Sequence, residues 1–292
     1  MWLYAWVNSR GSFLLSIAAY TSMHSLESTS MTPAIGVFDS GVGGLSVLRH
    51  IQQQLPHEHL LYVADSLNAP YGPKPQAFII ERSRNIAQFL IESGAKAIVV
   101  ACNTATAAAI RILRNELDIP VIGMEPAVKP AAAATRSGVV GVLATTGTLK
   151  SAQFAALLEH YGKHIKVVAQ ACVGLVECIE RGELDTPSTR ALVAGYVAPL
   201  MEEGADTIVL GCTHYPFIKP LIADIAGPDV VLIDTGAAVA RQVGHRLEEA
   251  GLLTASRAPG SVKAWTNSAA GNAQQLIRLL HAGHIDVEVF NG

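Results

Sequence analysis

Two cysteines, Cys102 and Cys212, end two near-copies of one segment, and their chemistry makes them the first candidates for function. The copies read Gly94-Ala-Lys-Ala-Ile-Val-Val-Ala-Cys102-Asn-Thr104 and Gly204-Ala-Asp-Thr-Ile-Val-Leu-Gly-Cys212-Thr-His214. The glycines and the cysteines are both offset by 110 residues (204 − 94 and 212 − 102). In each copy a glycine that can end a helix precedes an apolar run of strand length, and the thiol follows it. Two opposed thiols suit proton transfer on both faces of a single carbon.

The residues after each thiol also bear on its reactivity. Asn103-Thr104 and Thr213-His214 are polar and stand where a helix should begin. Because a helix N-terminus lowers the pKa of a thiol, we predict that both cysteines form thiolates readily. His214 could assist proton transfer at Cys212 or stabilise its thiolate.

A glycine-rich turn, Asp39-Ser-Gly-Val-Gly-Gly44, follows a predicted strand and opens a predicted helix. Its glycines permit a tight turn, and amides at a helix start favour an anion. No Gly-Lys-Ser/Thr follows, and the spacing departs from the dinucleotide fingerprint. A carboxylate ligand therefore fits better than a pyrophosphate, and a tight turn without a ligand is the alternative.

A second loop, Asn68-Ala-Pro70-Tyr71-Gly72-Pro73, is stiffened by two prolines. Proline and glycine clusters most often form rigid surface turns. The functional alternative is a loop that presents Tyr71 and the Gly72 backbone to a small polar ligand.

Short apolar runs alternate with longer amphipathic stretches from Thr32 onward. The predicted strands are Ile35–Asp39, Leu60–Ala64, Ala97–Ala101, Val121–Gly123, Val139–Leu143, Ile165–Ala169, Thr207–Gly211 and Val230–Asp234. The predicted helices span 43–54, 75–93, 103–117, 148–161, 187–203, 215–226 and 235–250. This alternation predicts a parallel or mostly parallel α/β sheet, and the uniformly apolar strands predict helices on both faces.

The duplication extends to an earlier strand in each half. Ile35–Gly41 is similar to Val140–Thr146, with Gly36 and Gly141 offset by 105 residues. Ligands collect outside the carboxyl ends of strands in open α/β sheets. We therefore expect two similar halves, related by a pseudo-twofold, that face each other across one cleft.

Composition and charge exclude several classes of protein. The 292 residues are 50% hydrophobic and 15% charged, with net charge −3, which indicates an ordered fold without the basic surface of a nucleic-acid or anionic-membrane binder. Four cysteines without a Cys-x-x-Cys pair indicate free thiols in the cytoplasm. Cys172 and Cys178 are interpreted as structural. Paired metal ligands are missing, so no metal is expected.

The first thirty residues contain apolar runs that Arg10 and Gly11 interrupt. The runs are too short for a membrane-spanning helix, and a secretory signal would carry a basic segment first. The favoured interpretation of residues 1–31 is a disordered extension or a start assigned too early, with Met31 beginning the folded protein.

Taken together, four motifs resemble those of the bacterial glutamate racemases. They are Asp39-Ser-Gly-Val-Gly-Gly44, Pro70-Tyr71-Gly72, Ala101-Cys102-Asn103-Thr104 and Leu210-Gly-Cys212-Thr-His214-Tyr-Pro216. The resemblance covers about Ile35 to Asp234 and implies cofactor-independent interconversion of L- and D-glutamate, which supplies D-glutamate for peptidoglycan. It also implies two flavodoxin-like three-layer α/β/α halves, in a homodimer, with domains at 32–126 plus about 236–292 and at 127–235.

The resemblance also implies roles for individual residues. Cys102 and Cys212 would be the acid/base thiols, with Asp39 serving the first and His214 the second. The substrate would be held by Asp39, Ser40, Tyr71, Gly72, Asn103, Thr104, Thr213 and His214. The family also has an active-site glutamate, for which Glu180 is the closest match and Glu177 a near competitor.

Three alternatives stay open on the sequence. Another racemase of the superfamily, acting on aspartate or a hydantoin, would share the fold and the thiols. A cysteine hydrolase would use Cys212 as nucleophile and His214 as base, but would leave the second thiol unexplained. A non-catalytic amino-acid-binding protein would tolerate loss of the thiols.

Overall fold

The structure is a computed structural model that describes residues 32–268, 271–281, 283 and 285–292. The predictions for residues 1–31, including the signal-peptide alternative and the start at Met31, lie outside the described residues. Residues Pro33–Gly292 form one unit that contains two sheets. Among the described helices, none has both the length and the apolar character needed to cross a bilayer.

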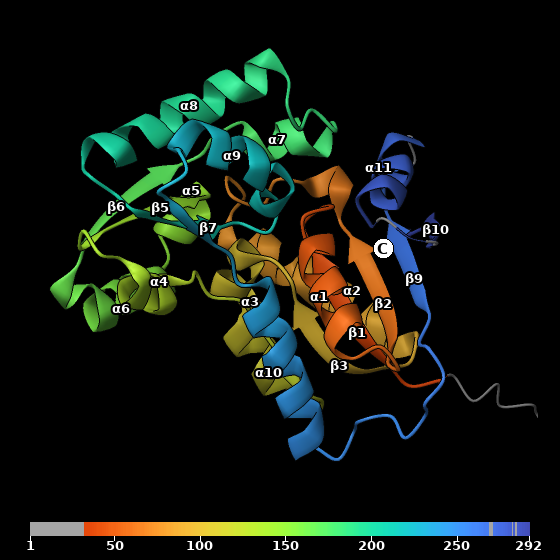
Figure 1. Ribbon diagram of the computed structural model, residues 1–292. Helices are drawn as coiled ribbons and strands as arrows, with labels where there is room; N and C mark the ends of the chain where they lie inside the picture. The colour runs from red at the N-terminus through yellow and green to blue at the C-terminus, as the bar shows by residue number, and fades with distance from the viewer. Residues whose placement is uncertain (1–31, 269–270, 282, 284) are drawn as a thin grey trace, which may run out of the picture. The chain divides into compact units, whose positions relative to one another are not determined.

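The first sheet has six strands in the order β10-β9-β2-β1-β3-β4, and all its pairings are parallel. The strands are β1 (Ala34–Asp39), β2 (His59–Ala64), β3 (Ala95–Val100), β4 (Val121–Ile122), β9 (Val262–Thr266) and β10 (Asp286–Val289). One face packs against α1 (Leu45–Gln54), α10 (Gly236–Glu249) and α11 (Gly271–His281). The other face packs against α2 (Gln76–Glu92) and α3 (Asn103–Glu116). We call these elements, with the 3₁₀ turn η1 (Ser66–Asn68), the first half (Figure 1).

The second sheet has four parallel strands in the order β6-β5-β7-β8. The strands are β5 (Val139–Ala144), β6 (Lys166–Ala171), β7 (Thr207–Gly211) and β8 (Val231–Ile233). One face packs against α7 (Leu175–Glu180), α8 (Pro187–Glu202) and α9 (Lys219–Ala226). The other packs against α4 (Val128–Ala134) and α6 (Ala152–Tyr161). We call these elements, with α5 (Thr146–Leu149), η2 (Gly162–His164) and η3 (Tyr215–Ile218), the second half.

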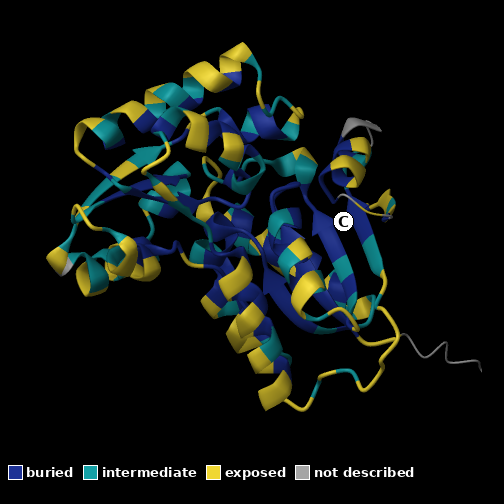
Figure 2. Ribbon diagram, in the orientation of Figure 1, coloured by how far each residue is buried: buried dark blue, intermediate teal, exposed yellow. Residues whose placement is uncertain are grey.

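The two sheets share one strand order, because β2-β1-β3-β4 corresponds to β6-β5-β7-β8. All residues of β1 and β7 are buried, as expected for strands covered on both faces (Figure 2). The predicted fold class of two similar three-layer α/β halves is therefore confirmed. The domain boundaries near residues 126 and 236 stay a prediction.

Glycines end the helices that precede the two thiol-bearing segments, as predicted. Gly94 follows α2 with φ 95°, and Gly204 follows α8 with φ 81°. Both angles lie in the left-handed region that glycine adopts without steric cost. Each helix therefore stops where the next buried strand must begin.

The structure differs from the sequence predictions in several elements. The predicted helix 148–161 is broken, because the Ser151 hydroxyl accepts a hydrogen bond from Phe154 N at 3.1 Å and caps a separate α6. The predicted helix 215–226 begins as the 3₁₀ turn η3. The predictions missed α4, α7, α11, β9 and β10. α4 and α7 are too short to show a helical period, and the exposed strand β10 alternates charged and apolar residues.

Gly195 offers a stability test in the interior of α8. A Cβ at this exposed position would meet nothing within 4 Å, and its φ is not left-handed. We therefore expect Gly195→Ala to raise the free energy of unfolding by about 0.5–1 kcal/mol. Urea denaturation should measure this gain. Gly141→Ala is the contrasting variant, because its Cβ would lie 2.7 Å from Leu200 Cδ1, and we expect it to destabilise by about 1–3 kcal/mol.

Candidate active site

The carboxyl ends of the strands in the two sheets carry the residues that the sequence singled out. Asp39 ends β1, Cys102 follows β3 and Cys212 follows β7. Hydrogen bonds join these ends across the halves. Ser46 Oγ donates to Thr213 O at 2.9 Å, and Thr213 Oγ1 donates to Asp39 Oδ2 at 3.3 Å. The two halves therefore contact each other at these strand ends.

The carboxylate of Asp39 organises the glycine-rich turn. Asp39 is fully buried, and its oxygens accept from Ser40 N at 2.7 Å and from Gly44 N at 2.6 Å. The amide of Val42 donates instead to Glu180 Oε1 at 2.7 Å. The prediction that these amides favour an external carboxylate is therefore wrong for these three, because carboxylates of the protein occupy them. Burial raises the pKa of the Asp39 carboxyl.

Cys102 caps the N-terminus of α3. Its sulfur accepts a hydrogen bond from Ala105 N at 3.4 Å, and its thiol lies 3.7 Å from Ser40 Oγ. The amide of Ala105 lowers the pKa of this thiol, but burial and the charge of Asp39 raise it well above its usual range. The prediction of a readily formed thiolate is therefore wrong for Cys102, which rests as a neutral thiol.

Cys212 has a different partner. Its sulfur lies 3.7 Å from Nδ1 of His214, and His214 Nε2 lies 2.6 Å from Glu180 Oε1. Burial alone would lower the pKa of His214, but the hydrogen bonds with Cys212 and Glu180 raise it well above its usual value. His214 is therefore an imidazolium that can stabilise a Cys212 thiolate. Cys212 does not cap an α-helix, since η3 follows it from Tyr215.

Glu180, and not Glu177, reaches the site. Glu180 is the last residue of α7, and its carboxylate contacts His214, Val42 N and Ser66 Oγ. Glu177 lies one turn earlier on the same helix and makes none of these contacts. These contacts favour Glu180 over Glu177 as the glutamate that the family resemblance implied.

The loop at Pro70–Gly72 is held by a hydrogen bond to the buried carboxylate of Asp65. Tyr71 is buried, and its hydroxyl donates to Asp65 Oδ2 at 2.5 Å. Arg82 donates to both oxygens of Asp65, at 2.7 and 3.0 Å, and Asn267 Nδ2 donates at 2.6 Å. Because Asp65 takes the Tyr71 hydroxyl, the backbone is the part of this loop that is left to bind a ligand. No motif in the sequence pointed to Asp65, Arg82 or Asn267.

A small enclosed cavity lies between the halves. It is lined by Ser40, Pro70, Tyr71, Gly72, Cys102, Asn103, Thr104, Thr145, Val176, Cys212, Thr213 and His214. The space open to a water-sized sphere is about 10 Å³, roughly room for one water molecule. The structure thus gathers both thiols and the predicted substrate residues around one cavity, with Asp39 and Glu180 behind its wall.

Thr145 lines this cavity and was not among the predicted site residues. It lies 105 residues after Ser40 (145 − 40), which is the offset of the earlier repeat, so the duplication could have identified it. Its hydroxyl lies 2.8 Å from Thr104 Oγ1, across the halves. Val176 also lines the cavity, and no pattern in the sequence pointed to it.

Asn103 is buried, and neither atom of its side-chain amide has a hydrogen-bond partner among the described residues. Unpaired buried polar groups are costly, so this amide is suited to a polar ligand. The backbone amides of Asn103 and Thr104 belong to the first turn of α3, where N–H groups lack helical partners. Together these groups can bind a carboxylate and an ammonium group.

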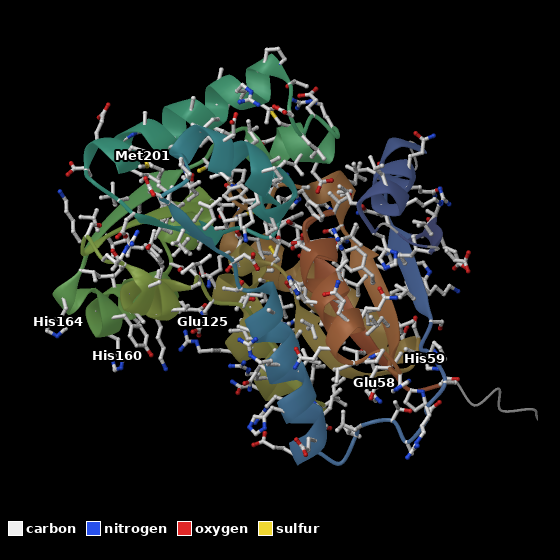
Figure 3. The ribbon with its side chains drawn as sticks, in the orientation of Figure 1. Glu58, His59, Glu125, His160, His164 and Met201 are labelled. Carbon is white, nitrogen blue, oxygen red and sulfur yellow. The ribbon has the colours of Figure 1, made fainter. Side chains whose placement is uncertain are left out.

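Cys172, Cys178 and the described histidines other than His214 do not line this cavity. Cys172 and Cys178 are buried free thiols, and burial raises the pKa of Cys172 to about 12. His57 and His164 are exposed, and His164 points outward (Figure 3). Within the described ranges, no group of three or more His, Cys, Asp or Glu side chains is placed to hold a metal ion.

Comparisons with known proteins agree with this geometry. The family model for Asp/Glu/hydantoin racemase matches residues 35–243. The glutamate racemase of Methylococcus capsulatus is 58% identical over 249 residues, covering 85% of this chain and 92% of its own. The glutamate racemase structure from Escherichia coli, with L-glutamate and the activator UDP-MurNAc-Ala, has a TM-score of 0.79 at 33% identity, covering 89% of this chain and all of its own. The glutamate racemase structure from Francisella tularensis, with D-glutamate, has a TM-score of 0.77 at 30% identity, covering 89% of this chain and 97% of its own. The chain therefore belongs to the glutamate racemases, within the Asp/Glu/hydantoin racemase family.

Proposed function

We propose that this protein interconverts L- and D-glutamate by a two-thiol mechanism without a cofactor, and so supplies D-glutamate for peptidoglycan. The observation that carries the mechanism is the pair of thiols, Cys102 and Cys212, which line one cavity from equivalent strand ends. Related structures contain D-glutamate and L-glutamate, which supports glutamate as the substrate.

The two thiols have different partners. His214 Nδ1 lies 3.7 Å from the sulfur of Cys212 and can assist proton transfer there, so Cys212 is the group that takes the α-proton in one direction of the reaction. Cys102 is a neutral thiol and donates its proton to the opposite face of the carbon. After one turnover Cys212 carries a proton and Cys102 is the thiolate, so the reverse reaction uses the same groups with exchanged roles.

The cavity also provides groups that hold the substrate. The free side-chain amide of Asn103 and the first amides of α3 suit the α-carboxylate and α-ammonium groups. The backbone of Tyr71 and Gly72, together with Ser40 and Thr213, lines the remaining wall. Fixed donors in a site with little room for water stabilise the carbanion more than bulk water would.

A cysteine hydrolase is the second candidate function. The contacts from Cys212 to His214 and from His214 to Glu180 have the order of a nucleophile, a base and a group that orients the base. A hydrolase leaves the position of Cys102 on the same cavity without a role, so we favour the racemase. Assembly as a homodimer, which the family resemblance implied, and location in the cytoplasm, which the free cysteines indicated, stay predictions.

Incubation with L-glutamate in D₂O, without added cofactor, tests the proposal. We expect loss of optical rotation together with deuterium at Cα, because the thiol that donates the second proton exchanges with solvent. Polarimetry and NMR follow the two changes. Turnover of aspartate alone would retain the mechanism and change the substrate. Inertness toward both amino acids would contradict the racemase and favour the hydrolase or a binding protein.

A further inference from the structure

Glu180 belongs to the second half, but its carboxylate also binds the first half. Its Oε1 lies 2.6 Å from His214 Nε2 within its own half. The same oxygen accepts from Val42 N at 2.7 Å in the first half, and Oε2 accepts from Ser66 Oγ at 3.3 Å. One oxygen atom therefore joins the glycine-rich turn to the histidine that serves Cys212.

This arrangement makes the surroundings of Glu180 depend on contact between the halves. Its side chain is 14% exposed, and the turn at Gly41–Val42 covers it so closely that a Cβ on Gly41 would collide with Oε1. If the halves separate, water replaces Val42 N and Ser66. A solvated carboxylate attracts the His214 imidazolium less strongly than a desolvated one does.

The cavity must widen to admit the substrate. It has room for about one water molecule, whereas glutamate is several times larger. Because residues of both halves line the cavity, separation of the halves is the opening step on which the proposal below is built.

We propose that Glu180 is a positioning residue that couples closure of the two halves to the placement of the His214 imidazole beside the sulfur of Cys212. In the closed state Glu180 holds His214 in this position, and in the open state His214 loses this support. His214 is thus placed to assist proton transfer at Cys212 mainly when the substrate is enclosed. This inference rests on the proposed racemase function, since it concerns the base of that reaction.

Three variants separate the charge of Glu180 from its contact with the first half. Glu180→Gln keeps an oxygen for Val42 N but removes the charge, so we expect kcat to fall about 10- to 100-fold with KM nearly unchanged. Glu180→Ala removes both, so kcat should fall and KM should rise. Gly41→Ala adds a methyl group in the first half that collides with the Glu180 carboxylate, and it leaves α7 unchanged. If Glu180→Ala folds poorly, Gly41→Ala replaces it, and we again expect kcat to fall and KM to rise. Glu177→Gln, on the same helix, is the matched control and should match the wild type.

Hydrogen exchange at the Val42 amide reports closure directly. At saturating glutamate we expect this amide to exchange about tenfold or more faster in Glu180→Ala than in the wild type, and at nearly the wild-type rate in Glu180→Gln. Mass spectrometry of a peptide containing Val42 measures it. A fall in kcat with unchanged Val42 exchange in Glu180→Ala would overturn the coupling, because Glu180 would then act on His214 alone. Full activity in Glu180→Gln would overturn it as well, whereas inactivity of the wild type toward glutamate would refute the racemase function itself.

Discussion

Replacement of Cys212 by serine should lower kcat for glutamate racemisation by about 10³-fold or more. An alcohol is a far weaker acid than a thiol, so a serine beside His214 is a far poorer group for taking up and returning the α-proton. Cys102→Ser should cause a loss of the same order, because the second face of the carbon then has no efficient proton donor. Circular dichroism of glutamate over time measures both rates.

Cys178→Ser is the control for these variants, because Cys178 is a buried free thiol outside the cavity. We expect it to keep activity within a few-fold of the wild type. Racemisation at the wild-type rate in Cys212→Ser would refute the two-thiol mechanism. A loss confined to one of the two cysteine variants would instead indicate a mechanism with a single thiol.

Gly43→Ala should lower kcat/KM by about 100-fold or more while the fold is retained. A Cβ at Gly43 would lie 2.6 Å from His214 Cε1 and 2.7 Å from Thr213 Oγ1, both in the opposite half. The φ of Gly43 is not left-handed, so alanine fits its own backbone and the conflict arises when the halves close. A displacement of about 1 Å at reacting groups can cost about 100-fold in rate. Steady-state kinetics and thermal unfolding together test this expectation.

Gly195→Ala is the control for this variant, since its added Cβ touches nothing. It should retain wild-type kinetics. A Gly43→Ala protein with the wild-type kcat/KM would show that the contact of this turn with His214 is not needed for catalysis. A Gly43→Ala protein that is unfolded would show that closure and folding of the halves are not separable at this turn.

Local patterns in the sequence were sufficient for much of the fold and for the identity of the thiols. The strands that end at Asp39 and before Cys212 are mostly apolar, so their burial could be predicted from neighbours in the chain. Gly94 and Gly204 in the same way marked the ends of the helices before the two thiol-bearing segments. The constant offset between the two copies also predicted that Cys102 and Cys212 are equivalent. Two copies of one local pattern imply equivalent positions in two sheets.

Elements with weak local patterns could not be predicted. β9 and β10 extend the first sheet beyond β2, although about 200 residues separate them from it in the chain. Asn267, just after β9, reaches Asp65 and so fixes the loop of Tyr71. Such contacts depend on which strands pair with each other in the sheet. The periodicity of apolar residues along a short segment does not indicate that pairing.

The sequence by itself determined which residues we propose carry the chemistry, and the tertiary structure decided which groups surround them and so their protonation. Cys102 caps a helix, as its local sequence predicts, but burial and Asp39 keep it a neutral thiol. Glu180 was chosen over Glu177 by contact with Val42, which is 138 residues away in the chain. Burial and the approach of distant charges set the protonation of a group, and both arise only when elements that are far apart in the chain pack together.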